Sequence, residues 1–259
     1  MSLLFHQIVF GPIHSRRLGK SLGVNLLPAH RKWCSFDCIY CECGWNADGA
    51  EDRHLPSKQD VAQALEQKLW ELANQNVDPD VITFSGNGEP TLHPDFKAII
   101  KTTITLRNFY TPNAKVCVLS NATQLGRSDV FEALLIVDKR IMKIDSAFQE
   151  TVQKINQPAS GYDIKHIVNQ LKRFNGDFVL QTLFLRGYYK GAVIDNATWE
   201  EITAWLNIIR ELKPKEVMIY TLDRETPAEG LEKVPIDELE AIAEQVRLLN
   251  LNIQLNVAG

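Results

Sequence analysis

The chemistry most visible in this sequence is that of three cysteines within eight residues. Cys34, Cys38 and Cys41 are separated by three and then two residues, so one short loop can curl around a single object and present three sulfurs to it. Thiolates are soft metal ligands, and iron–sulfur clusters are held by thiolates that come largely from tight loops. A four-iron cluster with three cysteine ligands keeps one iron open, and that iron is available for chemistry.

A zinc site is the alternative for the same loop. Structural zinc is bound by four ligands, and Cys43 or His54 is near enough in the sequence to supply the fourth. Spacing alone does not separate the two metals. Of the two remaining cysteines, we interpret Cys43 as a bystander and Cys117, which lies in an apolar run, as a buried structural thiol.

A second motif covers residues 85–90 and reads Ser-Gly-Asn-Gly-Glu-Pro. Gly86 and Gly88 allow the backbone to approach another group closely. The carboxylate of Glu89 can accept charge-assisted hydrogen bonds from an ammonium group. Such a segment by itself is most often an ordinary turn after a strand. Next to the cysteine loop, it indicates a site for an amine.

The elements that must position these residues alternate between strands and helices along the whole chain. Amphipathic helices are expected after the capping residues Ser57 and Thr198 and over residues 164–171. Apolar runs predict strands at Leu22–Leu27, Val81–Ser85, Val116–Ser120, Ile141–Asp145, Phe178–Leu185, Val217–Thr221 and Asn252–Val257. Alternation of this kind predicts parallel strands joined by right-handed crossovers.

Polar residues gather where these strands end. They are Ser85–Pro90, Ser120–Asn121, Asp145–Ser146, Arg186–Gly187 and Tyr220–Thr221. The carboxyl ends of parallel strands meet at one edge of the sheet, and sites form there. The cysteine loop also follows a strand, so we expect it at the same edge. Asn121 and Asp145 could bind a ligand at this edge, and capping of the following helix is an equally good role for both.

Composition narrows the class of protein. The 259 residues, 45% of them hydrophobic, can bury a core that fits one barrel-like domain or two small ones, and we favour one. No apolar run reaches 18 residues, no signal peptide is recognisable, and the odd number of cysteines argues against disulfides. We therefore expect a cytoplasmic protein without a membrane partner. The net charge of −4 gives no general attraction for nucleic acid.

The motifs together resemble the radical S-adenosylmethionine superfamily. The cysteine spacing is similar to its cluster motif, with Tyr40 at the aromatic position that usually lies against the cofactor's adenine. Residues 85–90 are similar to the glycine-glutamate-proline motif that grips the methionine amino group. The resemblance implies a [4Fe-4S] cluster on Cys34, Cys38 and Cys41, and S-adenosyl-L-methionine bound to the open iron through its amine and carboxylate.

The resemblance also implies an α/β fold, a partial (β/α)6 TIM-like barrel of parallel strands. We expect a single domain over residues 1–259, with a core of about 20–225, an N-terminal extension over 1–19 and a C-terminal helix and strand over 235–259. Reductive cleavage of the cofactor would give a 5′-deoxyadenosyl radical that abstracts hydrogen from an unidentified substrate. The electron would come from a separate donor of the flavodoxin or ferredoxin type. The expected cofactor-binding residues are Tyr40, Ser85, Gly86, Gly88, Glu89, Asn121, Asp145 and Arg186.

Within the superfamily, residues 10–25 resemble the start of wyosine-type transfer-RNA synthases. His14, Arg16 and Arg17 in this stretch form an anion-binding candidate, because guanidinium groups suit phosphate and carboxylate. Those synthases carry a second cluster on further cysteines, which this chain cannot assemble. The same reaction is therefore not expected here, and the candidate substrates are an RNA base, a small metabolite or a peptide side chain. The alternative functions are a glycyl-radical-enzyme activase and a non-catalytic iron–sulfur or zinc protein.

Overall fold

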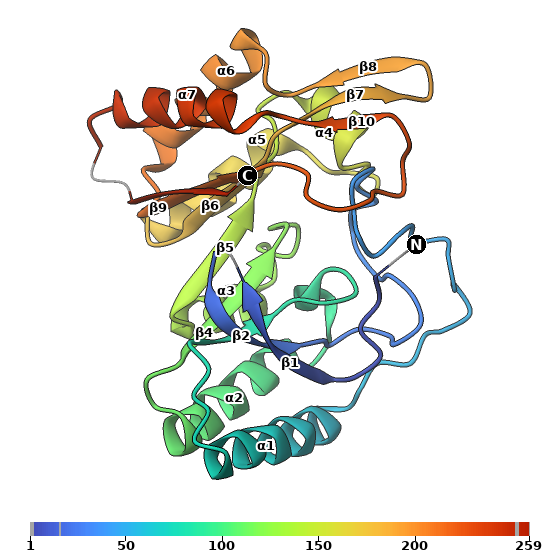
Figure 1. Cartoon of the computed structure of the whole chain (residues 1–259), viewed down its shortest axis with the longest axis vertical. Coiled ribbons are helices and arrows are strands. Elements are labelled where there is room, and N and C mark those ends of the chain that lie inside the picture. Colours follow the sequence, from blue (N-terminus) through green and yellow to red (C-terminus); the bar gives the residue numbers. More distant parts are fainter. Residues whose placement is uncertain (1–2, 16, 252–253, 259) are drawn as a thin grey trace.

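A mostly parallel sheet forms the centre of the fold (Figure 1). The computed structural model describes residues 3–15, 17–251 and 254–258. In spatial order the strands are β1 (Val9–Ser15), β2 (Gly19–Val24), β3 (Val81–Phe84), β4 (Lys115–Ser120), β5 (Lys139–Lys143), β6 (Val179–Leu183), β9 (Glu216–Tyr220) and β11 (Gln254–Ala258). All pairings from β2 to β11 are parallel, and β1 is antiparallel to β2. The predicted α/β partial barrel is confirmed.

Helices connect the parallel strands and cover the outside of the sheet (Figure 1). They are α1 (Lys58–Asn74), α2 (Phe96–Tyr110), α3 (Ser128–Ile136), α4 (Gln149–Ile155), α5 (Ile164–Leu171), α6 (Trp199–Leu212) and α7 (Ile236–Arg247), with the 3-10 turns η1 (Pro90–Leu92) and η2 (Lys172–Phe174). None of the helices in the described part of the chain is long and apolar enough to cross a membrane.

The predicted helix starts are confirmed by their hydrogen bonds. The hydroxyl of Ser57 accepts a bond from the backbone N–H of Asp60, whose carboxylate accepts one from Ser57 in return. Thr198 caps α6 by accepting a bond from the N–H of Glu201. The apolar face of α1 is buried on the sheet, as the spacing of its residues requires.

The core lies on both sides of the sheet. The larger part fills the space between the sheet and the helices. A smaller part fills the inside of the barrel and consists of Val81, Cys117, Ile141, Val179 and Met218. Cys117 is fully buried there, which confirms that it is an interior thiol.

Three strands differ clearly from the expectation. The run predicted as Leu22–Leu27 is observed as β2, Gly19–Val24, which begins and ends three residues earlier. The run predicted as Phe178–Leu185 ends at Leu183, because the N–H of Phe184 bonds to the carbonyl of Tyr220 and the chain then leaves the barrel. It enters a three-stranded sheet in the order β10 (Leu231–Lys233), β7 (Leu185–Tyr189) and β8 (Ala192–Asp195). Strand β1 was not expected, since its residues are mostly half-exposed and its register is irregular. The C-terminal strand is described from Gln254; Asn252 and Ile253 lie outside the described residues.

Candidate active site

The cysteine loop is fastened to the carboxyl edge of the sheet by backbone hydrogen bonds. The N–H of Trp33 donates to the carbonyl of Asn87 over 2.7 Å, and the N–H of Glu89 donates to the carbonyl of Trp33 over 3.1 Å. On the other side, the N–H of Ile39 donates to the carbonyl of Ile155 over 2.9 Å, at the end of α4. The loop therefore lies across the end of β3 and reaches the segment that follows β5.

Both glycines of the 85–90 motif permit close packing. A Cβ atom on Gly88 would lie 2.0 Å from the carbonyl oxygen of Trp33, and one on Gly86 would lie 2.6 Å from the side-chain oxygen of Asn25. Both residues also have a positive φ, +137° and +132°, which side chains other than hydrogen disfavour. The close approach expected for a ligand is thus made, at Gly88, by the cysteine loop itself.

Two asparagine side chains donate hydrogen bonds to cysteine sulfurs. The amide of Asn121 lies 3.6 Å from the sulfur of Cys34, and that of Asn156 lies 3.4 Å from the sulfur of Cys38. Burial raises the pKa of Cys34, and it raises the pKa of Cys38 to about 11. A hydrogen bond from Cys43 lowers the pKa of Cys41 to about 6. Amide donors of this kind favour the thiolate form that a metal requires.

A buried lysine adds positive charge beneath the loop. Lys32 is 1% exposed, and its ammonium group donates to Asp37 over 2.9 Å and to the carbonyl of Gly44 over 3.2 Å. Burial acts to lower the pKa of Lys32, but Cys41, Cys38 and Asp37 raise it overall. The lysine therefore remains charged and can balance an anionic group held by thiolates. Sequence reasoning missed Lys32, although a lysine two residues before a metal-binding cysteine is a usable signal.

This donor set fits a cluster better than a single ion. In the described part of the chain, no three His, Cys, Asp or Glu side chains form a group that could hold one metal ion. A four-iron cluster makes a different demand, because each thiolate binds its own iron. Three thiols on one loop, with amide donors to two of them and a buried cation nearby, meet that demand.

Glu89 lies at the predicted place but is engaged by the protein. One carboxylate oxygen accepts bonds from the N–H and hydroxyl of Thr91 and, over 2.9 Å, from the hydroxyl of Ser120. The other oxygen accepts a bond of 2.7 Å from the N–H of Asn121. The side chain is 2% exposed, and burial raises its pKa. Glu89 therefore joins the ends of β3 and β4, with one oxygen left lightly used.

Asp145 is the centre of a second buried network. Its carboxylate accepts bonds from the hydroxyl of Tyr40, from the amide of Asn156 over 2.7 Å and from the N–H of Leu183 over 3.0 Å. The ammonium group of Lys143 lies 3.2 Å away. Burial by itself lowers the pKa of Lys143, but Asp145 raises it overall. Asp145 and Tyr40 are thus brought to the cysteine loop as expected, and Lys143 is a neighbour that sequence reasoning missed.

The structure does not bring Arg186 to this site. Its guanidinium forms two bonds to the carboxylate of Glu238 on α7, of 3.1 and 2.7 Å, and lies 3.6 Å from Asp195. The reason is that the chain has already left the barrel for the small sheet when it reaches Arg186. Arg17 takes a place near the loop instead, and Arg16 lies outside the described residues.

A cavity of about 300 Å³ opens beside the cysteine loop. Tyr40, Cys41 and Cys43 line it from the loop, Ser85 and Gly86 from the end of β3, and Leu183, Tyr220 and Arg17 from the opposite side. Four of the predicted residues therefore share this cavity: Tyr40, Cys41, Ser85 and Gly86. Its size is at the lower end of small-molecule sites.

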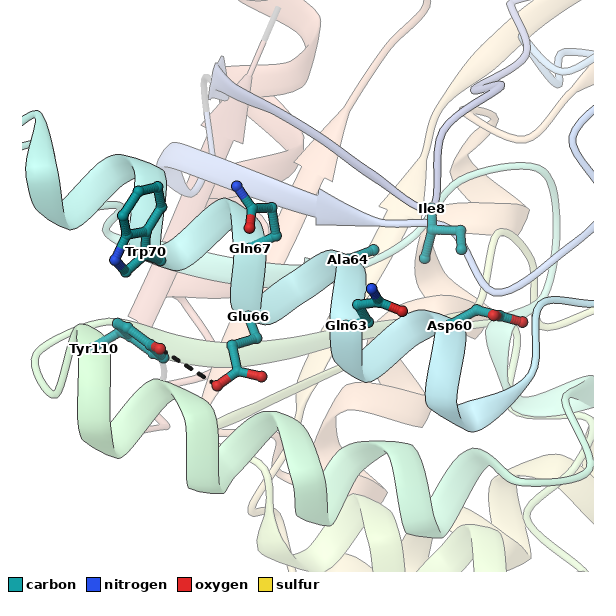
Figure 2. A pocket seen from close by; sticks show the side chains of 8 residues that line it. All are labelled: Ile8, Asp60, Gln63, Ala64, Glu66, Gln67, Trp70 and Tyr110. Atoms are coloured by element: carbon teal, nitrogen blue, oxygen red, sulfur yellow. Dashed lines mark hydrogen bonds between the residues drawn. The ribbon is translucent and has the colours of Figure 1, made fainter.

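A larger groove lies away from this chemistry. It measures about 710 Å³ and runs along α1, with Tyr110 of α2 and Ile8 at its sides (Figure 2). Trp70 is 53% exposed there, and the hydroxyl of Tyr110 donates to Glu66 over 3.4 Å. No cysteine lines this groove, and we assign it no part in the reaction.

Comparison with known families identifies one match. Residues 30–198, more than half of the chain, match the profile described as the radical SAM superfamily. The chain is 31% identical to a UPF0026 protein of Methanocaldococcus jannaschii over 248 residues, which is 94% of this chain and 71% of that one. It is also 31% identical over 254 residues to a Brachyspira hyodysenteriae protein named GTPase Obg, covering 96% of this chain but only 35% of that protein.

Solved structures show the same fold at low identity. Streptococcus suis SuiB bound to S-adenosylmethionine superposes with a TM-score of 0.65 at 16% identity, over 92% of this chain and 50% of SuiB. TYW1 with a lysine-pyruvate adduct gives 0.61 at 17% identity, over 88% of this chain and 73% of that one. The wyosine branch expected from residues 10–25 is not confirmed, because the relatives by sequence include UPF0026 proteins.

Proposed function

We propose that the cysteine loop and the cavity beside it form the site of a radical reaction. The chain belongs to the radical SAM superfamily and to the UPF0026 family. Membership supports cleavage of S-adenosylmethionine to start radical chemistry. In our proposal Cys34, Cys38 and Cys41 hold one [4Fe-4S] cluster, which when bound supplies the electron for that cleavage. The substrate is a molecule that enters the 300 Å³ cavity.

The observation that carries the proposal is the position of this cavity. It connects Cys41 of the cysteine loop directly to Ser85 and Gly86 at the end of β3. A cofactor that touches both an open iron and the 85–90 motif must occupy the space between these two places. The backbone carbonyl of Ser85 is suited to accept a hydrogen bond from its amine. That of Gly86 already accepts bonds from the N–H of Gly88 over 2.9 Å and from the thiol of Cys43 over 3.3 Å.

Several contacts fix the walls of the cavity. Phe5, Leu183 and Leu222 give part of the wall apolar surface. The hydroxyl of Tyr40 is bonded to Asp145 and so is not a free polar group in the cavity. Asn121, bonded to Ser35 over 2.8 Å, holds the loop against the end of β4. Walls that are fixed in this way limit the side reactions of a radical.

The proposal also needs an electron from outside. A separate donor of the flavodoxin or ferredoxin type would dock near the cysteine loop, and no membrane partner is needed. The edge of the cavity that faces away from the sheet is formed by Glu42 and Arg224, whose side chains pair over 2.6 Å. This exposed pair lies in the wall of the same cavity as Cys41, and we propose it as the docking edge.

The test is anaerobic reconstitution with iron and sulfide, followed by reduction with dithionite and measurement of 5′-deoxyadenosine. The wild-type protein should be brown, bind about four irons and form deoxyadenosine. Cys38→Ala should lose both the colour and the product. Cys117→Ala is the matched control, because it removes an equally buried sulfur from inside the barrel.

Two results would contradict the proposal. The first is a wild-type protein that holds zinc, or holds iron without forming deoxyadenosine. The second is loss of iron in Cys43→Ala, which would mean that the ligands are assigned wrongly. Cys43→Ala is expected to keep its iron, because Cys34, Cys38 and Cys41 already supply the three thiolates of the proposed cluster.

A further inference from the structure

Arg17 crosses the inside of the barrel. It lies in the turn between β1 and β2, yet its guanidinium carbon is 4.3 Å from the centre of the Tyr220 ring at the end of β9. In the sheet, β2 and β9 are separated by β3, β4, β5 and β6. The arginine therefore spans from one side of the partial barrel to the other, below the cysteine loop.

The turn that presents Arg17 is held in place. The hydroxyl of Ser15 accepts a bond of 3.2 Å from the N–H of Leu18. The carboxylate of Asp80 accepts a bond of 2.7 Å from the N–H of Lys20. Gly19 has a φ of +77°, and a Cβ atom there would lie 2.5 Å from the same carboxylate. These bonds hold the chain directly after Arg17, from Leu18 to Lys20.

The guanidinium of Arg17 has an unused hydrogen-bond donor. Its Nη1 atom is buried and has no hydrogen-bond partner among the residues that the structure describes. The other cations at this site are paired: Lys143 with Asp145 over 3.2 Å, and Arg224 with Glu42 over 2.6 Å. A buried donor without a partner is costly, and a guanidinium is best satisfied by a carboxylate or phosphate.

We propose that Arg17 binds the carboxylate or phosphate group of a small acidic substrate in this cavity. The inference rests on the proposed function and names the class of molecule on which it acts. The cofactor takes the part of this cavity between Cys41 and Gly86, so only the part beside Arg17 and Tyr220 is left for the substrate. That space suits a small molecule rather than a polymer. Leu183 and Leu222 in the same walls suit a short apolar part of that molecule.

The cofactor's own carboxylate is a less suitable partner. The motif residues for the cofactor lie at the end of β3, whereas Arg17 stacks on Tyr220 at the end of β9. Arg17 also lines a second cavity of about 480 Å³ at the opposite, amino end of the strands, together with Lys115 and Lys139. The Arg17 side chain therefore extends from the amino end of the strands toward their carboxyl end, where the cysteine loop lies.

The test measures anion binding directly in the reconstituted, unreduced protein. Inorganic phosphate and propionate are titrated separately by calorimetry, with and without S-adenosylmethionine, and the affinity for S-adenosylmethionine is measured alongside. Arg17→Gln should weaken binding of the recognised anion at least about tenfold, the loss expected for a charge-assisted pair. The anion affinity of Arg17→Lys should lie between those of wild type and Arg17→Gln, because lysine keeps the charge but not the planar guanidinium.

Arg224→Gln is the matched control. It removes a guanidinium from the same cavity wall, but one that is 60% exposed and already paired with Glu42. Anion affinity in this variant should stay within about twofold of wild type. Binding of phosphate alone would indicate a phosphate ester as substrate, and binding of propionate alone a carboxylic acid; either supports the inference. Thermal melting of each variant verifies that it is folded.

Three results would overturn the inference. Equal loss of anion binding in both glutamine variants would show only a general positive field. Weaker S-adenosylmethionine binding in Arg17→Gln, as large as the loss for the anion, would assign Arg17 to the cofactor. Unchanged anion affinity in a folded Arg17→Gln protein would remove the site. None of these depends on deoxyadenosine formation, so failure of the proposed function is seen separately.

Discussion

The two sides of the barrel mouth treat polar residues in opposite ways. On the side of β3 to β5, Glu89 and Asp145 accept every bond that neighbouring strands and loops offer, and both are almost fully buried. On the side of β9, the cavity is open and Arg17 keeps an unpaired donor. The first side fixes the cysteine loop in space, and the second keeps room for a ligand. A polar residue at a strand end is therefore no proof of ligand contact.

A substitution at Gly88 should disturb the anchored side of the barrel mouth most strongly. Gly88→Ala should prevent the loop from bonding to β3, because the new Cβ atom would overlap the carbonyl of Trp33 at 2.0 Å. We expect a loss of about 3 kcal/mol or more in unfolding free energy from strain and overpacking together, and loss of most bound iron. Urea unfolding and iron analysis of the reconstituted protein measure both effects.

Two other glycines serve as controls for that substitution. Gly161→Ala has the same positive sign of φ but no atom within 4 Å of the new Cβ, and Gly126→Ala has neither problem. Gly161→Ala should cost about 1–2 kcal/mol and keep its iron. If Gly88→Ala behaves like Gly161→Ala, the close contact between the loop and β3 is not needed for the site.

The next largest effect is expected at Asp145. Asp145→Asn removes the negative charge beside Lys143 and leaves a buried ammonium group with 14% exposure of its side chain. Loss of one partner from a buried pair costs about 3–5 kcal/mol. Urea unfolding of the metal-free protein should show this loss. Asp129→Asn, which breaks an exposed pair with Arg127, should cost less than about 1 kcal/mol; equal losses would mean that the Asp145 network is not a framework.

The smallest effect is expected at Arg186, and it tests the sequence-based assignment directly. Arg186→Gln breaks a half-buried pair with Glu238 and should cost about 1 kcal/mol. Affinity for S-adenosylmethionine, measured by calorimetry, should stay within about twofold of wild type. A loss of about tenfold or more in this affinity would show that Arg186 is a cofactor ligand after all, and it would contradict the difference drawn between the two sides.

The local features of this protein were predictable from its sequence, and the long-range ones were not. The cysteine spacing, the helix caps at Ser57 and Thr198, and the alternation that makes the barrel strands parallel follow from patterns within a few residues. The partners of Asp145 do not, since Tyr40 lies 105 residues away in the chain. Sequence position at a strand end placed Arg186 at the site, but the break after Leu183 turned it outward. Arg17 was visible only as part of a basic stretch.

The way the cysteine loop is anchored has a consequence for how the protein survives oxygen. Peptide groups at Trp33 and Ile39 tie the loop to its neighbours, so much of its shape is fixed by backbone hydrogen bonds rather than by the sulfurs alone. Many small metal sites collapse when the ion leaves, because binding and folding share one free energy. Here the empty loop should keep its shape after oxidative damage, and repair requires only fresh iron and sulfide rather than a new round of folding.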